Sequence, residues 1–304
     1  MTEDHESELQ ELLEEVRRIE AMSRRLVSAL LSGFYISVFR GSGIEFDEVR
    51  EYVPGDDPRT VDWNVTARMG RPYVKKYIDE RELTVMFLLD LSASMTGGFG
   101  VWSARQMAAR ICGCLALTAV RNDDKVGLIA FSREVDRHVP AQKGIGHTLR
   151  IIRDCLILPG ASAGTSLAPA LEFASRVLRR RSILFVVSDF LTAGWSKALG
   201  LCARRHDVIA VRLLPPELTP PARGLTRLRD PETGRVSVVD WSDPRTRDVY
   251  RERGERWRAE VAEKLRRASV DLMDVPVPRT QDRDAVARPI MKFFRMRELR
   301  GAKR

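Results

Sequence analysis

The sequence has few of the features that mark exported or membrane-spanning proteins. Its longest uncharged apolar runs, residues 26–39 and 111–120, fall short of the roughly 20 residues that span a bilayer. The first residues are acidic, whereas a signal peptide begins with basic residues and continues with apolar ones. We therefore expect no transmembrane helix and a cytoplasmic location.

Cysteine and histidine are scarce, with four residues of each in a chain of 304. No CxxC pair occurs and no histidines stand at zinc-ligand spacing, so the sequence offers no recognisable zinc site. Cys112 and Cys114 are two residues apart and would face different sides of a helix, which argues against a shared metal. A large cytosolic domain needs no disulfides, so we predict four buried thiols: Cys112, Cys114, Cys155 and Cys202.

The sequence also lacks internal repeats, low-complexity tracts and a GxxxxGK[ST] phosphate-binding loop, so neither a repeat architecture nor P-loop nucleotide binding is expected. Hydrophobic residues make up 44% and charged residues 31% of the chain, as in globular proteins. The net charge of +9 is unevenly distributed, because residues 1–20 hold eight acids and residues 281–304 hold eight basic residues against three acids. The C-terminus is therefore a candidate contact for a polyanion.

Apolar runs of strand length alternate with helical patterns along the middle of the chain. This alternation predicts an α/β fold with a doubly wound, mainly parallel sheet and helices on both faces. The predicted strands are residues 73–78, 83–90, 126–131, 182–188 and 207–214, and the predicted helices are residues 102–121, 145–157, 166–180 and 195–205.

The flanking segments extend this plan. Apolar positions at helical spacing predict a helix over residues 8–32. We divide the chain into an N-terminal accessory region, residues 1–80, and one α/β domain, residues 81–304. The α/β domain is expected to include a hairpin insertion near residues 225–241 and a basic C-terminal helix.

Oxygen-bearing side chains follow the most apolar strand. In "VMFLLDLSASM", residues 85–95, the side chains of Asp90, Ser92 and Ser94 occupy alternate positions and can converge on one point. Ligands of an open parallel sheet collect outside the carboxyl ends of its strands. A carboxylate with two hydroxyls suits a hard cation that prefers oxygen ligands. A local alternative stays open, in which Ser92 or Ser94 caps the next helix and Asp90 accepts backbone N–H bonds.

Two later segments supply matching groups. Thr165 stands just before a predicted helix in "GASAGTSLAPAL", and Asp189 ends another apolar strand in "ILFVVSDFL". Five oxygen groups from three neighbouring loops would nearly fill the octahedral shell of Mg²⁺ or Mn²⁺ and leave room for water or an outside carboxylate. The predicted metal ligands are Asp90, Ser92, Ser94, Thr165 and Asp189.

These residues carry a family resemblance. The D-x-S-x-S pattern at residues 90–94, followed by Thr165 and Asp189, resembles the metal-ion-dependent adhesion site of von Willebrand factor A-like domains. Upstream, "REYVPGDDPRTVDWNVTAR" (50–68) and "DERE" (79–82) resemble the bacterial "domain of unknown function 58" family, a von Willebrand A-like group. The resemblance implies that an acidic residue of a partner takes the remaining position on the metal.

The resemblance also implies a class of partner. Proteins of this kind are thought to work with MoxR-type AAA+ ATPases, as adaptors in the assembly or activation of other complexes. The expected activity is therefore metal-dependent recognition of another protein, with Mg²⁺ or Mn²⁺ as the cofactor and without catalysis.

Two other classes of function stay open. The basic C-terminus could bind nucleic acid or an anionic membrane surface, although Ile290 and Phe293 there suggest one packed face of a helix. The sequence "GASAG", residues 160–164, matches the G-x-S-x-G pattern and would make Ser162 the nucleophile of a serine hydrolase, for which His206 alone follows in hydrolase order.

Overall fold

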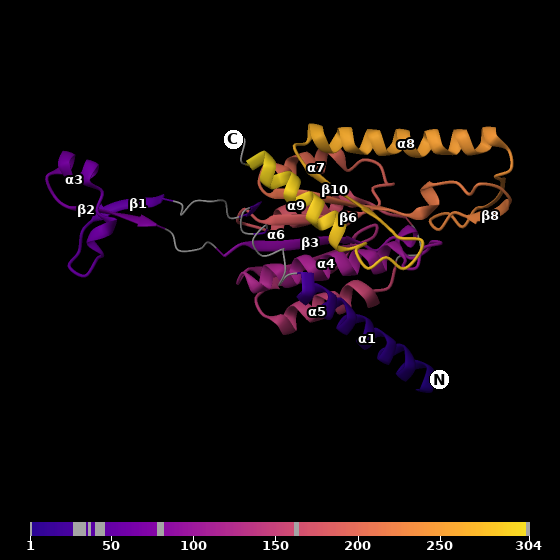
Figure 1. Cartoon of the computed structure of the whole chain (residues 1–304), viewed down its shortest axis with the longest axis horizontal. Helices are drawn as coiled ribbons and strands as arrows, with labels where there is room; N and C mark the ends of the chain where they lie inside the picture. Colours follow the sequence, from indigo (N-terminus) through magenta and orange to yellow (C-terminus); the bar gives the residue numbers. More distant parts are fainter. Residues whose placement is uncertain are drawn as a thin grey trace.

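The computed structural model centres on a six-stranded sheet with helices on both faces (Figure 1). The strand order is β10-β7-β6-β3-β4-β5, and every neighbouring pair is parallel except β4 and β5. Read from the β5 edge, this is the doubly wound order 3-2-1-4-5-6. The predicted fold class is therefore confirmed. The residues that the structure describes are 2–26, 35, 38–39, 46–77, 82–160 and 164–301.

The central strands are continuously apolar because they are buried on both faces. Successive side chains of a strand point to opposite faces. Phe87 and Leu89 accordingly lie in one core cluster, whereas Met86 and Leu88 lie in the other. The strands of this sheet are β3 (Thr84–Asp90), β4 (Lys125–Phe131), β5 (Val135–Gln142), β6 (Ile183–Ser188), β7 (Asp207–Leu214) and β10 (Asp271–Pro276).

In the described part of the chain, helices cover both faces of the sheet. The core cluster on one face draws on α4, α5 and α9, and the cluster on the other face draws on α6, α7 and α8. No helix within the described ranges is both long and apolar enough to cross a membrane. The helices are α4 (Ala104–Arg121), α5 (Ile145–Ile157), α9 (Ala287–Gly301), α6 (Leu167–Val177), α7 (Ser196–Ala203) and α8 (Pro244–Arg267).

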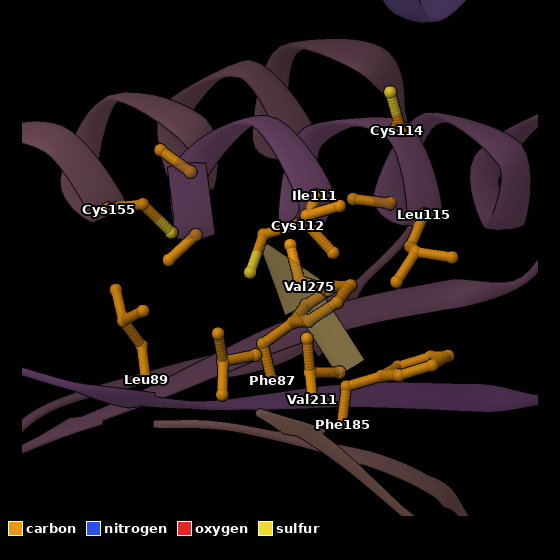
Figure 2. Packing of buried hydrophobic residues seen from close by; sticks show 14 of the residues in the cluster. Phe87, Leu89, Ile111, Cys112, Cys114, Leu115, Cys155, Phe185, Val211 and Val275 are labelled. Carbon is orange, nitrogen blue, oxygen red and sulfur yellow. The ribbon is translucent and has the colours of Figure 1, made fainter. Parts of the chain in front are cut away.

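Figure 2 shows the packing of α4 on the sheet. The rings of Phe87 and Phe185 stack with centroids 5.4 Å apart on neighbouring strands. The side chain of Cys112 points toward these rings, whereas that of Cys114 points away from the sheet. The four cysteines are all buried and free, as predicted, and these two lie on different faces of their helix.

Helix α1 (Thr2–Leu26) packs against α4 and α5. Ile19 is buried in the same core cluster as α4, and the hydroxyl of Ser23 lies 3.1 Å from the sulfur of Cys114. Gly113 allows this approach, since a Cβ there would lie 2.5 Å from a methyl carbon of Ile19. The division of the chain at residue 80 stays a prediction, but α1 shares its core with the α/β domain. The part of the predicted helix beyond Leu26 lies outside the described residues.

Residues 46–77 form a small unit that stands apart from the central sheet in Figure 1. Its two strands, β1 (Phe46–Glu51) and β2 (Tyr73–Tyr77), are antiparallel. Aspartate side chains cap its two helical segments, and Gly70 closes the second in the left-handed conformation. The helical segments are the 3-10 turn Pro58–Thr60 and α3 (Trp63–Met69).

Of two further elements, one was predicted from the sequence and the other was not. The predicted hairpin is present as β8 (Leu225–Arg229) and β9 (Val236–Asp240). Strand β5 was not predicted, because Pro140 and charged residues interrupt its alternation. It forms at the edge of the sheet, where a proline removes no hydrogen bond that the ladder needs.

Candidate metal centre

Asp90 ends β3 and is completely buried. Its Oδ1 accepts a hydrogen bond from the backbone N–H of Ser92 at 2.8 Å, and its Oδ2 accepts one from the hydroxyl of Ser188 at 2.6 Å. Strands β3 and β6 are parallel neighbours with Leu89 opposite Val187, so Asp90 and Ser188 end adjacent strands. The sheet therefore fixes this carboxylate from two sides.

The loop after β3 joins two serine hydroxyls to a second carboxylate. The Oγ atoms of Ser92 and Ser94 lie 3.0 Å apart, and the hydroxyl of Ser94 donates to Oδ2 of Asp189 at 2.6 Å. The side chain of Ser92 makes no capping hydrogen bond to the 3-10 turn Ala93–Met95 that follows it. The capping alternative is thus wrong for Ser92, although Asp90 does accept a backbone N–H.

Asp189 follows β6 and is held by an unusual turn. Its Oδ1 accepts a hydrogen bond from the N–H of Leu191 at 3.0 Å. The next residue, Phe190, has a φ of 58°, which is rare outside glycine and costs on the order of 1–3 kcal/mol. The N–H of Phe190 donates to the hydroxyl of Ser188, and its ring packs edge-on against Trp195 at 5.4 Å. These contacts hold the turn that places Asp189 beside Ser94.

Thr165 lies in the third loop, two residues before α6. Its carbonyl accepts a hydrogen bond from the hydroxyl of Thr192 at 2.9 Å, which ties this loop to the one after Asp189. The N–H of Ser166 donates to the carbonyl of Ser132 at the end of β4. The hydroxyl oxygen of Thr165 is buried, yet it makes no hydrogen bond within the described residues. An unpaired buried hydroxyl costs about 1–3 kcal/mol, so this atom needs a further partner.

Arg105 anchors the segment that leads into the third loop. Its Nε donates to the carbonyl of Cys155 at 2.8 Å, and its Nη2 donates to the carbonyl of Leu158 at 2.5 Å. Cys155 lies in the last turn of α5, and Leu158 directly follows that helix. Burial lowers the pKa of Arg105, and the negative charge of Asp90 acts in the opposite direction. The guanidinium therefore both fixes the chain and partly offsets the charge at the site.

Two buried carboxylates share this edge of the sheet. Burial, reinforced by the charge of Asp189, raises the pKa of Asp90 from 3.8 to about 6, although hydrogen bonds from Ser188 and Ser92 act the other way. Burial also raises the pKa of Asp189, and the charge of Glu232 adds to that increase. A divalent cation would favour the ionised form of both carboxylates.

The donor set fits a hard divalent cation. Carboxylate and hydroxyl oxygens are the ligands that Mg²⁺ and Mn²⁺ prefer. No group of three or more His, Cys, Asp or Glu side chains in the described part of the chain is placed to hold a metal, so such a site would depend on the hydroxyls. Hydrogen bonds join Asp90, Ser92, Ser94 and Asp189 into one network, and Thr165 lies in an adjoining loop. The metal-ligand roles of these five residues stay predictions.

Two residues of this region escaped the sequence reasoning. Ser188 binds Asp90, and its position at the end of an apolar strand is a signal that could have identified it. Glu232 binds the N–H of Ser94 at 3.2 Å and the N–H of Gly164 at 3.0 Å. No local pattern marks Glu232, because its partners are 138 and 68 residues away.

The two alternative functions depend on other residues. Ser162, the nucleophile of the hydrolase alternative, lies outside the described residues. In α9, the apolar residues Ile290 and Phe293 are buried, as predicted. Arg297 pairs with the carboxylates of Asp207 and Asp271, so part of the basic charge of this helix is used within the fold.

Comparison with protein families places this chain in a known group. A family model described as "Protein of unknown function DUF58" matches residues 48–260. The chain belongs to the DUF58 family. The match begins in the small unit at residues 46–77 and covers the three loops of the site and the β8–β9 hairpin.

Curated relatives of this DUF58 protein occur in mycobacteria. An uncharacterized protein of Mycobacterium tuberculosis (strain ATCC 25618 / H37Rv) is 32% identical over 291 residues, which cover 94% of this chain and 90% of that protein. An uncharacterized protein of Mycobacterium avium is 34% identical over 168 residues, which cover 54% of this chain and 95% of that protein. The family thus has bacterial members of nearly the same extent.

Solved structures with a similar arrangement are more distant in sequence. The conserved hypothetical protein BatB from Bacteroides thetaiotaomicron is 17% identical, with a TM-score of 0.42 and coverage of 70% of this chain and 99% of that one. The SpRpn10 VWA domain is 13% identical, with a TM-score of 0.40 and coverage of 69% and 97% respectively.

We predict that, in the metal-free protein, the stability of Asp90→Asn relative to the wild type rises with pH. Because the folded pKa of about 6 exceeds the unfolded value of 3.8, the ionised carboxylate destabilises the fold fully above pH 6, and the penalty disappears as the pH falls to 3.8. At 1.36 kcal/mol per unit, the pH-dependent part of this difference approaches about 3 kcal/mol at pH 7.5, and the hydrogen bond that the amide NH2 group cannot accept opposes it by about 1–3 kcal/mol at every pH. Urea unfolding in chelator at several pH values measures it.

The matched control is Asp136→Asn, which changes the same charge at an exposed position of β5. It should leave the unfolding free energy nearly unchanged across this pH range. A stability of Asp90→Asn relative to the wild type that stays constant between pH 4 and pH 7.5, or that rises as the pH falls, would contradict the account of this carboxylate.

Proposed function

We propose that this DUF58 protein is a metal-dependent protein-interaction module. Mg²⁺ or Mn²⁺ would be held by Asp90, Ser92, Ser94, Thr165 and Asp189. The observation that carries the proposal is the buried hydroxyl of Thr165, which has no hydrogen-bond partner among the described residues and lies in a loop tied to the one that follows the buried Asp189. A divalent cation would pair the hydroxyl and offset the charges of Asp90 and Asp189 at once.

The chemistry of the ion limits what the site can do. Mg²⁺ takes about six oxygen ligands in octahedral geometry, so five groups of this chain leave one position for an outside oxygen. An acidic side chain of another protein is the ligand that best matches a hard cation. The site would therefore recognise a partner through its carboxylate, and we propose recognition rather than catalysis.

The proposed partner class comes from the family resemblance. On that resemblance to von Willebrand A-like adaptors, we propose a MoxR-type AAA+ ATPase as the working partner, in the assembly or activation of other complexes. A cytoplasmic location, where such an ATPase works, belongs to the same proposal.

We predict that Mg²⁺ or Mn²⁺ raises the melting temperature of the wild type and not that of Asp90→Ala. A ligand at 100 times its dissociation constant adds about 2.7 kcal/mol to the folded state, which corresponds to a shift of several degrees. Thr165→Val should weaken the shift while leaving the metal-free melting temperature unchanged or higher, because valine removes a buried hydroxyl that has no partner in the described part of the chain. Differential scanning calorimetry with and without EDTA gives the measurement.

The control for this experiment is Asp136→Ala, at an exposed position. It should show the full wild-type shift. Equal shifts in Asp90→Ala and in the wild type would show that the metal does not bind at this site.

We further predict that a purified MoxR-type ATPase of the same organism binds the wild type in Mg²⁺ and loses binding in EDTA. Asp90→Ala should bind at least tenfold more weakly, which corresponds to about 1.4 kcal/mol. Surface plasmon resonance with immobilised ATPase measures both effects. Binding that survives both EDTA and Asp90→Ala, and that falls with salt instead, would favour the basic C-terminus as the contact.

A further inference from the structure

The tip of the β8–β9 hairpin reaches the candidate metal centre. The two oxygens of Glu232 accept separate hydrogen bonds, Oε1 from the N–H of Ser94 at 3.2 Å and Oε2 from the N–H of Gly164 at 3.0 Å. Ser94 and Thr165, which follows Gly164, are predicted metal ligands on two different loops. One carboxylate therefore bridges the two loops that supply the hydroxyls.

The turn presents this glutamate with a defined geometry. Oδ1 of Asp230 accepts the N–H of Glu232 at 2.9 Å, and its Oδ2 accepts the hydroxyl of Thr233 at 2.6 Å. Gly234 has a φ of 70°, and its N–H donates to the carbonyl of Asp230 at 2.8 Å, which closes the turn. These bonds form within the turn, so the shape of the tip does not depend on the site that it contacts.

The hairpin is attached to the body mainly at its tip and its base. Glu232 is the one side chain between residues 229 and 235 that is not exposed. Val238 on β9 and Leu225 on β8 are 67% and 73% exposed. The apolar residues Leu228 and Val239 are only half-buried, so apolar burial of the strands is incomplete. A two-stranded hairpin by itself is at best marginally stable in water. Polar contacts of one carboxylate therefore hold the tip.

The inner side of the hairpin also leaves space. A cavity of about 40 Å³ lies between Thr226 and Leu228 of β8 and the residues Trp241 and Tyr250 at the base. Trp241 is buried and packs edge-on against Tyr250, with ring centroids 5.0 Å apart. The base is therefore anchored, whereas the space beside β8 is incompletely filled, so the segment that carries the tip gains less packing than a filled contact would give.

The negative charge of Glu232 does not by itself favour a position near Asp90 and Asp189. Glu232 adds a third carboxylate to an edge that already holds Asp90 and Asp189, and its charge acts unfavourably on the ionised form of Asp189. The two backbone amides compensate for that repulsion. An acidic side chain held at this place matches what a cation with one open position would bind from a partner.

We propose that Glu232 is an internal occupant of the acidic-ligand position, so that the β8–β9 hairpin competes with the partner for the site. This inference rests on the proposed function, since it assigns a second carboxylate to the same recognition event. The partner's recognition element would then resemble the hairpin tip, with an acidic side chain presented on a tight turn, and binding would displace the hairpin.

The test uses a peptide with the sequence of the hairpin tip as the ligand. A cyclised peptide with the sequence LRDPETGRV, residues 228–236, is titrated by calorimetry into the wild type and Glu232→Ala in Mn²⁺. We expect binding to Glu232→Ala at least about tenfold tighter than to the wild type, because the internal competitor is gone. The same peptide with alanine in place of its glutamate should bind neither protein.

Two readouts separate the inference from the proposed function. Mn²⁺ affinity is measured alone in both proteins, and amide hydrogen exchange in EDTA reports whether Glu232 protects the N–H groups of Ser94 and Gly164. Glu252→Ala, an equal charge change at an exposed position of α8, should behave as the wild type in every assay.

Equal peptide binding to the wild type and Glu232→Ala, or no peptide binding to either protein when both bind Mn²⁺, would overturn the inference and leave the metal site standing. Unprotected Ser94 and Gly164 amides in the wild type would overturn it as well. Failure of Mn²⁺ to bind either protein would overturn the proposed function, and the inference with it.

Discussion

Two carboxylates buried at one edge of a parallel sheet are the constraint on which this structure depends. Asp90 ends β3 and Asp189 follows the neighbouring strand β6, and the fold places both out of water. Burial of a charged group is unfavourable unless hydrogen bonds or an opposite charge compensate it. The hydroxyls of Ser94 and Ser188 each donate a hydrogen bond to one of these carboxylates. The remaining unfavourable effect of burial raises the pKa values of Asp90 and Asp189.

The surroundings of this pair follow from the need to keep it in place. Arg105 is buried and binds the end of α5, so the third loop starts from a fixed point. Phe190 accepts an unfavourable backbone conformation because its ring is buried against Trp195. Packing energy from the two core clusters thus maintains a polar arrangement that would not be stable alone. Such strained and desolvated groups are typical of sites that bind or react.

Much of the fold could be predicted from the sequence because its strongest signals are local. The apolar runs of β3, β6 and β7 identify strands that are buried on both faces, and their alternation with helices fixes the sheet type. Strand β5 was missed because its residues are those of an edge strand, with Pro140 and charges in the pattern. Edge strands are shaped by the need to avoid further pairing, so they give weaker signals.

The residues of the candidate site likewise include some that could be predicted from the sequence and some that could not. Asp90 and Asp189 could be located because each ends an apolar strand, and strand ends gather at one edge. Glu232 could not, since it lies on an insertion whose position relative to the sheet no periodicity encodes. The small unit at residues 46–77 shows a related limit: its caps and turns follow from Asp57, Asp62 and Gly70, whereas no local pattern predicts that Trp63 is exposed.

The most direct test of the central claim is the anomalous scattering of Mn²⁺ in crystals of the wild type. The account predicts one strong peak bounded by oxygens of Asp90, Ser92, Ser94 and Thr165, with metal–oxygen distances of about 2.1 Å where the contact is direct. It also predicts that the Thr165 hydroxyl then has a partner. Crystals grown in Mn²⁺ that show no peak there, or a peak only at another place on the molecule, would contradict it.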